Sequence, residues 1–255
     1  MADPGPEPGT APRIAANITM LFAELAPLHR PAAARAAGFD GIEVLFPYDD
    51  PPEAWADACA GIPVALINTP PGDWAAGARG HAAVPGAEAR FRDGFRRALD
   101  LAAALAAGRI HVMAGIATGP QARATYLANL EWAADFGHPL TIEPLNPADM
   151  PGYMLNGYDA AADILDTLAI PHLGLQFDTW HAARLGGVMP MWRRHGHRAT
   201  HLQIAGEPVR AAPDAATCAA VRTMIGSGYA GWIAAEYRPR GPTTASLDWV
   251  ARLRP

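Results

Sequence analysis

The sequence predicts an α/β protein built as a single (β/α)8 TIM barrel. Eight short runs of apolar residues occur along the chain, and each is followed by a longer stretch of helical character. Runs that are apolar throughout are typical of parallel strands covered on both faces. The chain has 255 residues, 50% of them hydrophobic, so it can bury the one large core of a barrel. An open doubly wound sheet is the alternative, but the G-x-G-x-x-G motif typical of such folds does not follow the first run.

Each predicted strand precedes its own predicted helix. The first strand begins at Ile14, and the helix behind it starts at Pro31 and stops at Gly38, because proline favours helix starts and glycine favours helix ends. The other predicted strands are residues 41–46, 63–68, 109–115, 139–144, 172–178, 200–206 and 231–237. We therefore expect one barrel domain over residues 13–255, preceded by a disordered Pro- and Gly-rich tail at residues 1–12.

Composition argues against several classes of protein. The net charge of −5 offers no broad basic face, so no nucleic-acid partner is expected. All 20 basic residues are arginine, which excludes Schiff-base chemistry on lysine. The N-terminal residues lack the features of a signal peptide, and no apolar run is long enough for a membrane span, so no membrane partner is expected. Cys59 and Cys218 show no C-x-x-C spacing, and a cytoplasmic protein without disulfides is the expectation.

Polar side chains end the last four predicted strands. Glu143 ends TIE, Asp178 ends LQFD, Gln203 lies in HLQ and Glu236 ends IAAE. Because the active site of a barrel lies at the C-terminal ends of its strands, we expect these four side chains to meet at one rim. Three carboxylates in an apolar cavity repel one another unless a cation is present. An all-oxygen ligand set favours Mg²⁺ or Mn²⁺, so the four residues are predicted metal ligands. The alternative is that each acid caps a helix or pairs with an arginine.

Three further residues are candidates for substrate binding. His181 lies three residues past Asp178 on the same rim loop, where it could contact substrate oxygens, although an N-cap or surface histidine is the alternative. Glu43 lies within the second predicted strand and, if it faces the lumen, would bind substrate hydroxyls. Arg210 follows the seventh strand, where its planar guanidinium could hold a carboxylate with two hydrogen bonds. A solvated arginine at a loop tip is the alternative for this residue.

Two inward-facing side chains and one glycine-rich turn are expected to be structural. Gln176 and His201 precede predicted ligands by two positions, so strand alternation places them one layer deeper in the barrel. Hydrogen-bonded core groups are the expectation for both. The segment GSGYAG (226–231) looks like a phosphate cradle, but it precedes the eighth strand and therefore belongs to the opposite end of the barrel.

These residues and their surroundings resemble the hydroxypyruvate isomerase family of the xylose-isomerase-like barrels. The resemblance implies a metal held by Glu143, Asp178, Gln203 and Glu236, with the two glutamates also acting as the acid/base pair. It implies substrates such as hydroxypyruvate, interconverted with tartronate semialdehyde, or 2-oxotetronates, interconverted with 3-oxotetronates. The matching stretches are ANITMLFAELAPLHRPAAARAAGFDGIEVLFPYD, LINTPPGDWAAGARGHAAVPG, HVMAGI, IEPLNPADMPGYMLN, LQFDTWHA, HLQIAGEP and GYAGWIAAEYRPRG.

One loop departs from the family pattern. After Arg210 the family usually continues with a segment similar to HEPGTGE, whereas here a shorter connection with AAPDAATC follows and the acids of that segment are absent. Loops after strands shape the pocket of a barrel enzyme. The departure therefore bears on substrate identity more than on the type of reaction.

The expected activity is an isomerase that moves a carbonyl between adjacent carbons of a small hydroxy-keto acid. One glutamate would remove a proton next to the carbonyl to give an enediolate, and the other would return a proton on the neighbouring carbon. A ketose 3-epimerase and an inosose dehydratase are alternatives on similar barrels, as is a binding protein without turnover. A metal-dependent DNA-repair nuclease would need a His-rich multi-zinc site and a basic surface, and the sequence shows neither. A homo-oligomer is compatible with the sequence.

Overall fold

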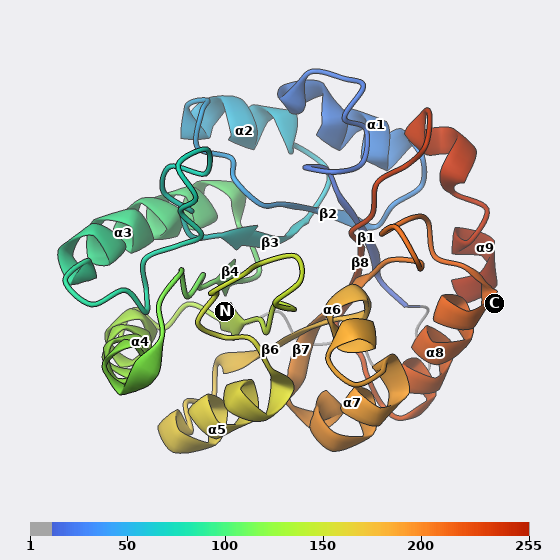
Figure 1. The fold of residues 1–255 in the computed structure, drawn as a ribbon. Helices are drawn as coiled ribbons and strands as arrows, with labels where there is room; N and C mark the ends of the chain where they lie inside the picture. Colours follow the sequence, from blue (N-terminus) through green and yellow to red (C-terminus); the bar gives the residue numbers. More distant parts are fainter. Residues whose placement is uncertain (1–11, 255) are drawn as a thin grey trace.

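The strands close into a parallel barrel in sequence order, and the helices surround them (Figure 1). The computed structural model describes residues 12–254, so residues 1–11 of the predicted tail lie outside the described residues. The first and last strands pair with each other and complete the barrel. The strands are β1 (Ile14–Asn17), β2 (Gly41–Val44), β3 (Val64–Asn68), β4 (Ile110–His111), β5 (Leu140–Ile142), β6 (Leu173–Asp178), β7 (Ala199–Ile204) and β8 (Trp232–Ala235). The predicted fold class is therefore confirmed.

The helices alternate with the strands. They are α1 (Arg30–Ala36), α2 (Pro52–Ala58), α3 (Glu88–Leu105), α4 (Gly119–Ala134), α5 (Tyr158–Leu168), α6 (Thr179–Arg184), α7 (Val188–His195), α8 (Ala215–Gly226) and α9 (Val250–Leu253), with short 3-10 helices η1 (Pro27–His29), η2 (Gly196–Arg198) and η3 (Thr243–Ser246). Within the described range, none of these helices has both the length and the apolar character that crossing a bilayer would require.

Several strands are shorter than the apolar runs that predicted them. The run at residues 109–115 forms only the two-residue strand β4, and β5 stops at Ile142. Pro144 has no N–H with which to extend a strand ladder, so the chain leaves β5 at Glu143. Apolar residues beyond the last paired positions instead form the rim loops around the mouth of the barrel.

The main core lies between the barrel and its helices. On α3, Phe91 and Phe95 pack against Trp132 of α4, with ring centroids 5.7 Å apart for Phe95 and Trp132. Phe136, just after α4, joins this aromatic cluster but is 44% exposed. Burial of these large rings holds α3 and α4 together on one side of the barrel.

Parallel pairing brings polar residues of neighbouring strands to the same height. Asp178 pairs with Gln203 across β6 and β7, and Asn17 pairs with Glu43 across β1 and β2. At the other end of β6, a Cβ on Gly174 would lie 2.2 Å from Oγ1 of Thr200, so glycine permits the close approach of β7 there. The strand register therefore places side chains of distant segments in one layer at the C-terminal end of the barrel.

Replacing Phe95 with alanine should destabilise the fold strongly. Phe95 is fully buried, and truncation of a buried phenylalanine costs about 3–5 kcal/mol because a cavity remains. Chemical denaturation monitored by circular dichroism would measure the loss. Phe136→Ala is the matched control, since its ring belongs to the same cluster but is partly exposed, and it should cost clearly less. Equal losses in the two variants would contradict the importance of burial at Phe95.

Candidate active site

A cavity of about 1070 Å³ opens at the C-terminal ends of the strands. Its polar lining includes Glu143, His181, Arg210 and Glu236. Its apolar wall is formed by Met20, Leu45, Phe46, Trp74, Met113 and Leu145. The GSGYAG turn borders a different cavity, of about 580 Å³, beside Arg109 and Trp232 at the N-terminal ends of the strands. The predicted polar rim and the predicted structural turn thus lie at opposite ends of the barrel.

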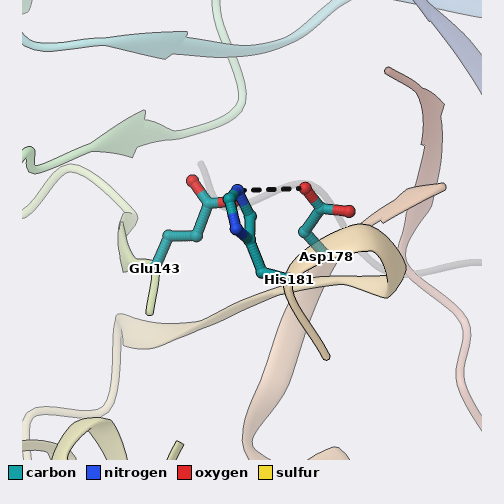
Figure 2. A group of neighbouring side chains, drawn as sticks. All are labelled: Glu143, Asp178 and His181. Carbon is teal, nitrogen blue, oxygen red and sulfur yellow. Dashed lines mark ion pairs between the residues drawn. The ribbon is translucent and has the colours of Figure 1, made fainter. Parts of the chain in front are cut away.

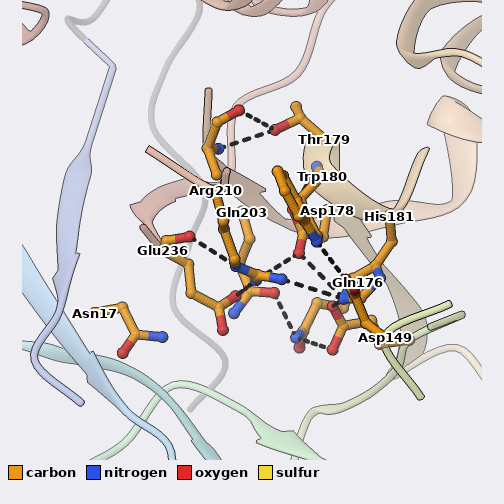
Figure 3. Close-up of polar contacts among 12 residues, drawn as sticks. Asn17, Asp149, Gln176, Asp178, Thr179, Trp180, His181, Gln203, Arg210 and Glu236 are labelled. Atoms are coloured by element: carbon orange, nitrogen blue, oxygen red, sulfur yellow. Dashed lines mark hydrogen bonds and ion pairs between the residues drawn. The ribbon is translucent and has the colours of Figure 1, made fainter. Parts of the chain in front are cut away.

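The four predicted ligands meet below this cavity. Glu143 follows β5, Asp178 ends β6, Gln203 lies within β7 and Glu236 follows β8. All four are buried, with exposed fractions of 0% for Asp178 and 6% for each glutamate. Figure 3 shows the side chains of Asp178, Gln203 and Glu236 directed toward a common region. The structure therefore brings together three acids and one amide that are far apart in the sequence.

Asp178 has two functions in the local structure. Its Oδ1 accepts a hydrogen bond from the backbone N–H of Trp180 at 2.8 Å, which caps the N-terminus of α6. Its Oδ2 accepts a hydrogen bond from Nη2 of Arg210 at 2.7 Å. Asp178 therefore both caps a helix and pairs with an arginine, as the alternative interpretation expected. These contacts do not remove it from the site, because Oδ2 still faces the acidic cluster.

Burial and mutual repulsion dominate the electrostatics of the two glutamates. Burial raises the pKa of Glu143 well above its ordinary value, and the nearby charges of Glu236 and Asp178 act in the same direction. Burial likewise raises the pKa of Glu236, against the opposing charge of Arg210. Oε2 of Glu236 lies 2.9 Å from Nη2 of Arg210 but has no well-aligned hydrogen-bond donor. The site as it stands is short of positive charge.

Arg210 is an internal partner of these acids and not a solvated loop residue. Its side chain is only 13% exposed and lies between Asp178 and Glu236 (Figure 3). Nε also donates to the backbone carbonyl of Glu236 at 3.1 Å. Burial by itself lowers the pKa of the Arg210 guanidinium. The negative charges of Asp178 and Glu236 raise it by more, so the net shift of the pKa is upward. The loop-tip alternative is therefore wrong.

His181 lies between Glu143 and Asp178, as Figure 2 shows. Its Nδ1 accepts a hydrogen bond from the backbone N–H of Asn146 at 3.0 Å, so the neutral ring carries its proton on Nε2. Nε2 is 3.5 Å from Oδ2 of Asp178 and 3.9 Å from Oε1 of Glu143. Burial lowers the pKa of His181 to about 4, although Asp178 opposes this, and the ring is neutral at pH 7. His181 thus presents an N–H donor to the cavity, and it is neither an N-cap nor a surface histidine.

The third candidate for substrate binding, Glu43, is fully buried inside the barrel. It faces the lumen as expected, but both of its carboxylate oxygens contact protein donors, among them Nε2 of Gln203 at 2.7 Å. Contact between Glu43 and substrate hydroxyls stays a prediction. The protein partners of both carboxylate oxygens argue against it, because they already occupy the atoms that would bind a hydroxyl. Gln176 and His201 are buried and hydrogen-bonded, as expected for core groups.

Polar residues also end strands in the first half of the barrel, where sequence reasoning did not look. Asn68 ends β3 and His111 ends β4, and both line the cavity. Nδ1 of His111 lies 3.2 Å from Oδ1 of Asn68 and 3.7 Å from Oε2 of Glu143. Burial, with the neighbouring histidines, lowers the pKa of His111 to about 3. The rule that identified the acids, a polar residue at the end of an apolar run, would have identified Asn68 as well. It would have missed His111, because Val112 and Met113 continue the apolar run and only the structure ends the strand at His111.

A metal-ligating arrangement can also be recognised from distances alone. Ligand atoms of Glu143, Asp178 and His181 all lie within 4.8 Å of one another. This group contains two of the four predicted ligands but includes His181 in place of Gln203 and Glu236. Because Nε2 of His181 carries a proton while Asn146 donates to Nδ1, the all-oxygen set is the better match to a hard divalent cation.

Comparisons with known proteins show which family the chain resembles. The model of the xylose isomerase-like TIM barrel family matches residues 31–253. The 2-oxo-tetronate isomerase of Cupriavidus necator is 44% identical, over 94% of this chain and 97% of its own length. The hydroxypyruvate isomerase of Escherichia coli is 36% identical, over 93% of this chain and 98% of its own length.

A solved structure extends the likeness to three dimensions. A Brucella melitensis crystal structure described as an AP endonuclease of family 2 superposes with a TM-score of 0.90 at 36% identity, covering 96% of this chain and 100% of its own. The D-allulose 3-epimerase of Methylomonas sp., at 19% identity and a TM-score of 0.69, shares the fold alone. The chain therefore belongs to the xylose isomerase-like TIM barrel family, and within it to the hydroxypyruvate isomerases that its sequence resembles.

Proposed function

We propose that this protein is a metal-dependent isomerase that moves a carbonyl between adjacent carbons of a small hydroxy-keto acid. The substrate would be hydroxypyruvate, giving tartronate semialdehyde, or a 2-oxotetronate, giving a 3-oxotetronate. The observation that carries the proposal is the convergence of Glu143, Asp178, Gln203 and Glu236 in one buried site. The names of the relatives, 2-oxo-tetronate isomerase and hydroxypyruvate isomerase, support the same reaction.

The donor set of the site fits a divalent cation. Glu143, Asp178, Gln203 and Glu236 would hold Mg²⁺ or Mn²⁺, since carboxylate and amide oxygens suit both ions. The poorly satisfied Oε2 of Glu236 is consistent with a cation position at this point. When bound, the ion would act as a Lewis acid toward the carbonyl and hydroxyl oxygens of the substrate.

The two glutamates would move the proton. Glu143 comes from β5 and Glu236 from β8, so they approach the cavity from different strands. One carboxylate removes a proton from the carbon beside the carbonyl, and the other delivers a proton to the former carbonyl carbon. A raised pKa suits this exchange, because it makes the carboxylate a stronger base toward the substrate carbon.

His181 and Arg210 would orient the substrate. The N–H at Nε2 of His181 can donate to a substrate oxygen without adding charge. Nη2 of Arg210 is occupied by the acids, whereas Nη1 has only a 3.4 Å contact with Nε2 of His181, so a donor remains for a substrate carboxylate. The apolar wall would exclude water from the enediolate while the proton is transferred.

The proposal extends to the setting of the enzyme. Cys59 and Cys218 are both buried and unpaired, which supports a cytoplasmic location because thiols stay reduced there. The three buried acids disfavour a polyanionic ligand such as a nucleic-acid backbone. A ketose 3-epimerase remains the alternative reaction, and it would act on uncharged sugars for which the Arg210 guanidinium has no carboxylate partner.

Turnover assays on purified protein with added Mn²⁺ should detect isomerisation of hydroxypyruvate or a 2-oxotetronate. Glu143→Gln and Glu236→Gln should each reduce kcat by at least about a hundredfold, the usual contribution of a positioned acid or base. Calorimetry must show that Mn²⁺ still binds, since both residues are also proposed ligands. Near-normal rates in either variant would refute the acid/base assignment, and activity on ketoses alone would favour the epimerase.

Asp178→Asn should weaken metal binding while preserving the helix cap. At about one hundred times its Kd, Mn²⁺ should stabilise the wild-type protein by about 2.7 kcal/mol, and the variant should lose most of this gain. Thermal denaturation with and without Mn²⁺ measures the difference. Asp214→Asn is the matched control, because Asp214 caps α8 through its Oδ1 and does not line the cavity. Unchanged Mn²⁺ stabilisation in Asp178→Asn would remove Asp178 from the ligand set.

Arg210→Lys should impair binding of acids more than binding of neutral sugars. Lysine keeps a positive charge near Asp178 and Glu236 but loses the planar fork, so KM for hydroxypyruvate should rise about tenfold or more. Steady-state kinetics with hydroxypyruvate and with an uncharged ketose of similar size make the comparison. Arg198→Lys, which alters an exposed pair with Asp166, is the control. Equal losses on both substrates would mean that the carboxylate is bound elsewhere.

A further inference from the structure

Beneath the floor of the cavity, buried side chains form a continuous hydrogen-bonded chain between two carboxylates. The chain begins at Glu143, passes through two amides and ends at a glutamate that takes no part in the proposed chemistry. Its members, from one end to the other, are Glu143, Gln176, Gln203 and Glu43. Each of the three links measures 2.7–2.9 Å, and the link between the two amides is visible in Figure 3.

The orientation of the Gln203 amide follows from its two neighbours. Nε2 of Gln203 donates to Oε1 of Glu43 at 2.7 Å, and Oε1 of Gln203 accepts from Nε2 of Gln176 at 2.8 Å. An ionised carboxylate only accepts hydrogen bonds, so only the amide nitrogen can face Glu43. A flipped amide would set oxygen against oxygen on one side and two N–H donors against each other on the other.

Glu43 itself is fixed by further donors. Nδ2 of Asn17 donates to its Oε1 at 2.6 Å, and Nε2 of His201 lies 2.7 Å from its Oε2. The side chains of Glu43 and His201 are completely buried. A buried carboxylate that accepts hydrogen bonds from three directions is rigid, and it has no oxygen directed to solvent.

Gln176 supports the same orientation from the other side. Its Nε2 also donates to Oε2 of Glu143 at 2.9 Å, while its Oε1 accepts from Oγ1 of Thr141 at 3.0 Å. Gln176 therefore presents only N–H groups to Glu143 and Gln203. The direction of every link is set by the carboxylates at the two ends.

We propose that Glu43 is a positioning residue for Gln203: by accepting the hydrogen bond from Nε2, it holds the amide so that Oε1 faces the acidic cluster. Oε1 is the only side-chain atom of Gln203 that can coordinate a cation, because the amide nitrogen carries two protons and no available lone pair. The inference rests on the proposed function, since the role of Gln203 as a metal ligand belongs to it. Glu43 acts through Gln203 and touches neither ion nor substrate.

The experiment measures Mn²⁺ affinity by calorimetry on the full-length protein after removal of metal with a chelator. Glu43→Leu leaves Nε2 of Gln203 without an acceptor and should weaken Mn²⁺ binding about 10–100-fold, the usual effect of losing a partner that orients a ligand. Glu43→Gln keeps an oxygen that can accept from Gln203 and should retain most of the affinity. Equal affinity in Glu43→Leu and the wild type would overturn the proposal.

A double-mutant cycle separates positioning from a general structural effect. In a Gln203→Ala background the ligand is already lost, so adding Glu43→Leu should cause little further loss of Mn²⁺ affinity. Losses that multiply in the double variant would overturn the proposal. Asn129→Leu is the control, because it removes a different buried hydrogen bond, from Nδ2 of Asn129 to the carbonyl of Ala82. It should lower the Tm and leave Mn²⁺ affinity unchanged.

A second pair of variants keeps the test decisive if Glu43→Leu does not fold. Gln203→Glu sets a carboxylate against Glu43, whereas Glu43→Gln combined with Gln203→Glu restores the hydrogen bond with its direction reversed. The double variant should have the higher Tm without metal and the tighter Mn²⁺ binding, and equal values would overturn the proposal. Since Mn²⁺ binding needs no substrate, an inactive wild-type protein would contradict the proposed isomerase function without deciding the role of Glu43.

Discussion

The repulsion among three buried carboxylates, those of Glu143, Asp178 and Glu236, is the constraint on which the rest of the site depends. Water is largely excluded from them, so their charges must be balanced by groups within the protein or by a bound cation. Arg210 supplies one positive charge, and Nε2 of Gln176 donates an uncharged hydrogen bond to Glu143.

The barrel makes this concentration of acids possible. Eight strands ending at one rim bring side chains from remote segments together, and close strand pairing keeps them at one height. The cost of burying the acids is offset by an extensive core between strands and helices, in which α3 and α4 share an aromatic cluster. Stability in the outer layer thus permits an electrostatically unfavourable centre, a division common in barrel enzymes.

The fold and the acidic cluster were predictable because each depends on local patterns. An apolar run ended by Glu143 or Asp178 marks a strand end whatever the loops do, and the same rule applies to Asn68. His111 lies inside its apolar run, so its place at a strand end has no such signal in the sequence. The protonated nitrogen of His181 depends on a backbone N–H in the loop after β5. The position of Arg210 depends on a loop closed by two hydrogen bonds between Gly206 and Ala211. Such loop geometry has no periodic signal in the sequence.

The double use of Asp178 has a mechanical consequence. One of its oxygens fixes the first turn of α6, and the same turn carries His181 three residues later. The acid at the centre of the site and the histidine that faces the cavity are therefore parts of one short rigid body, and neither can be displaced without the other. A ligand that pulls on Asp178 would also shift the N–H of His181, so occupancy of the ion position and alignment of a substrate oxygen are coupled through a single helical turn.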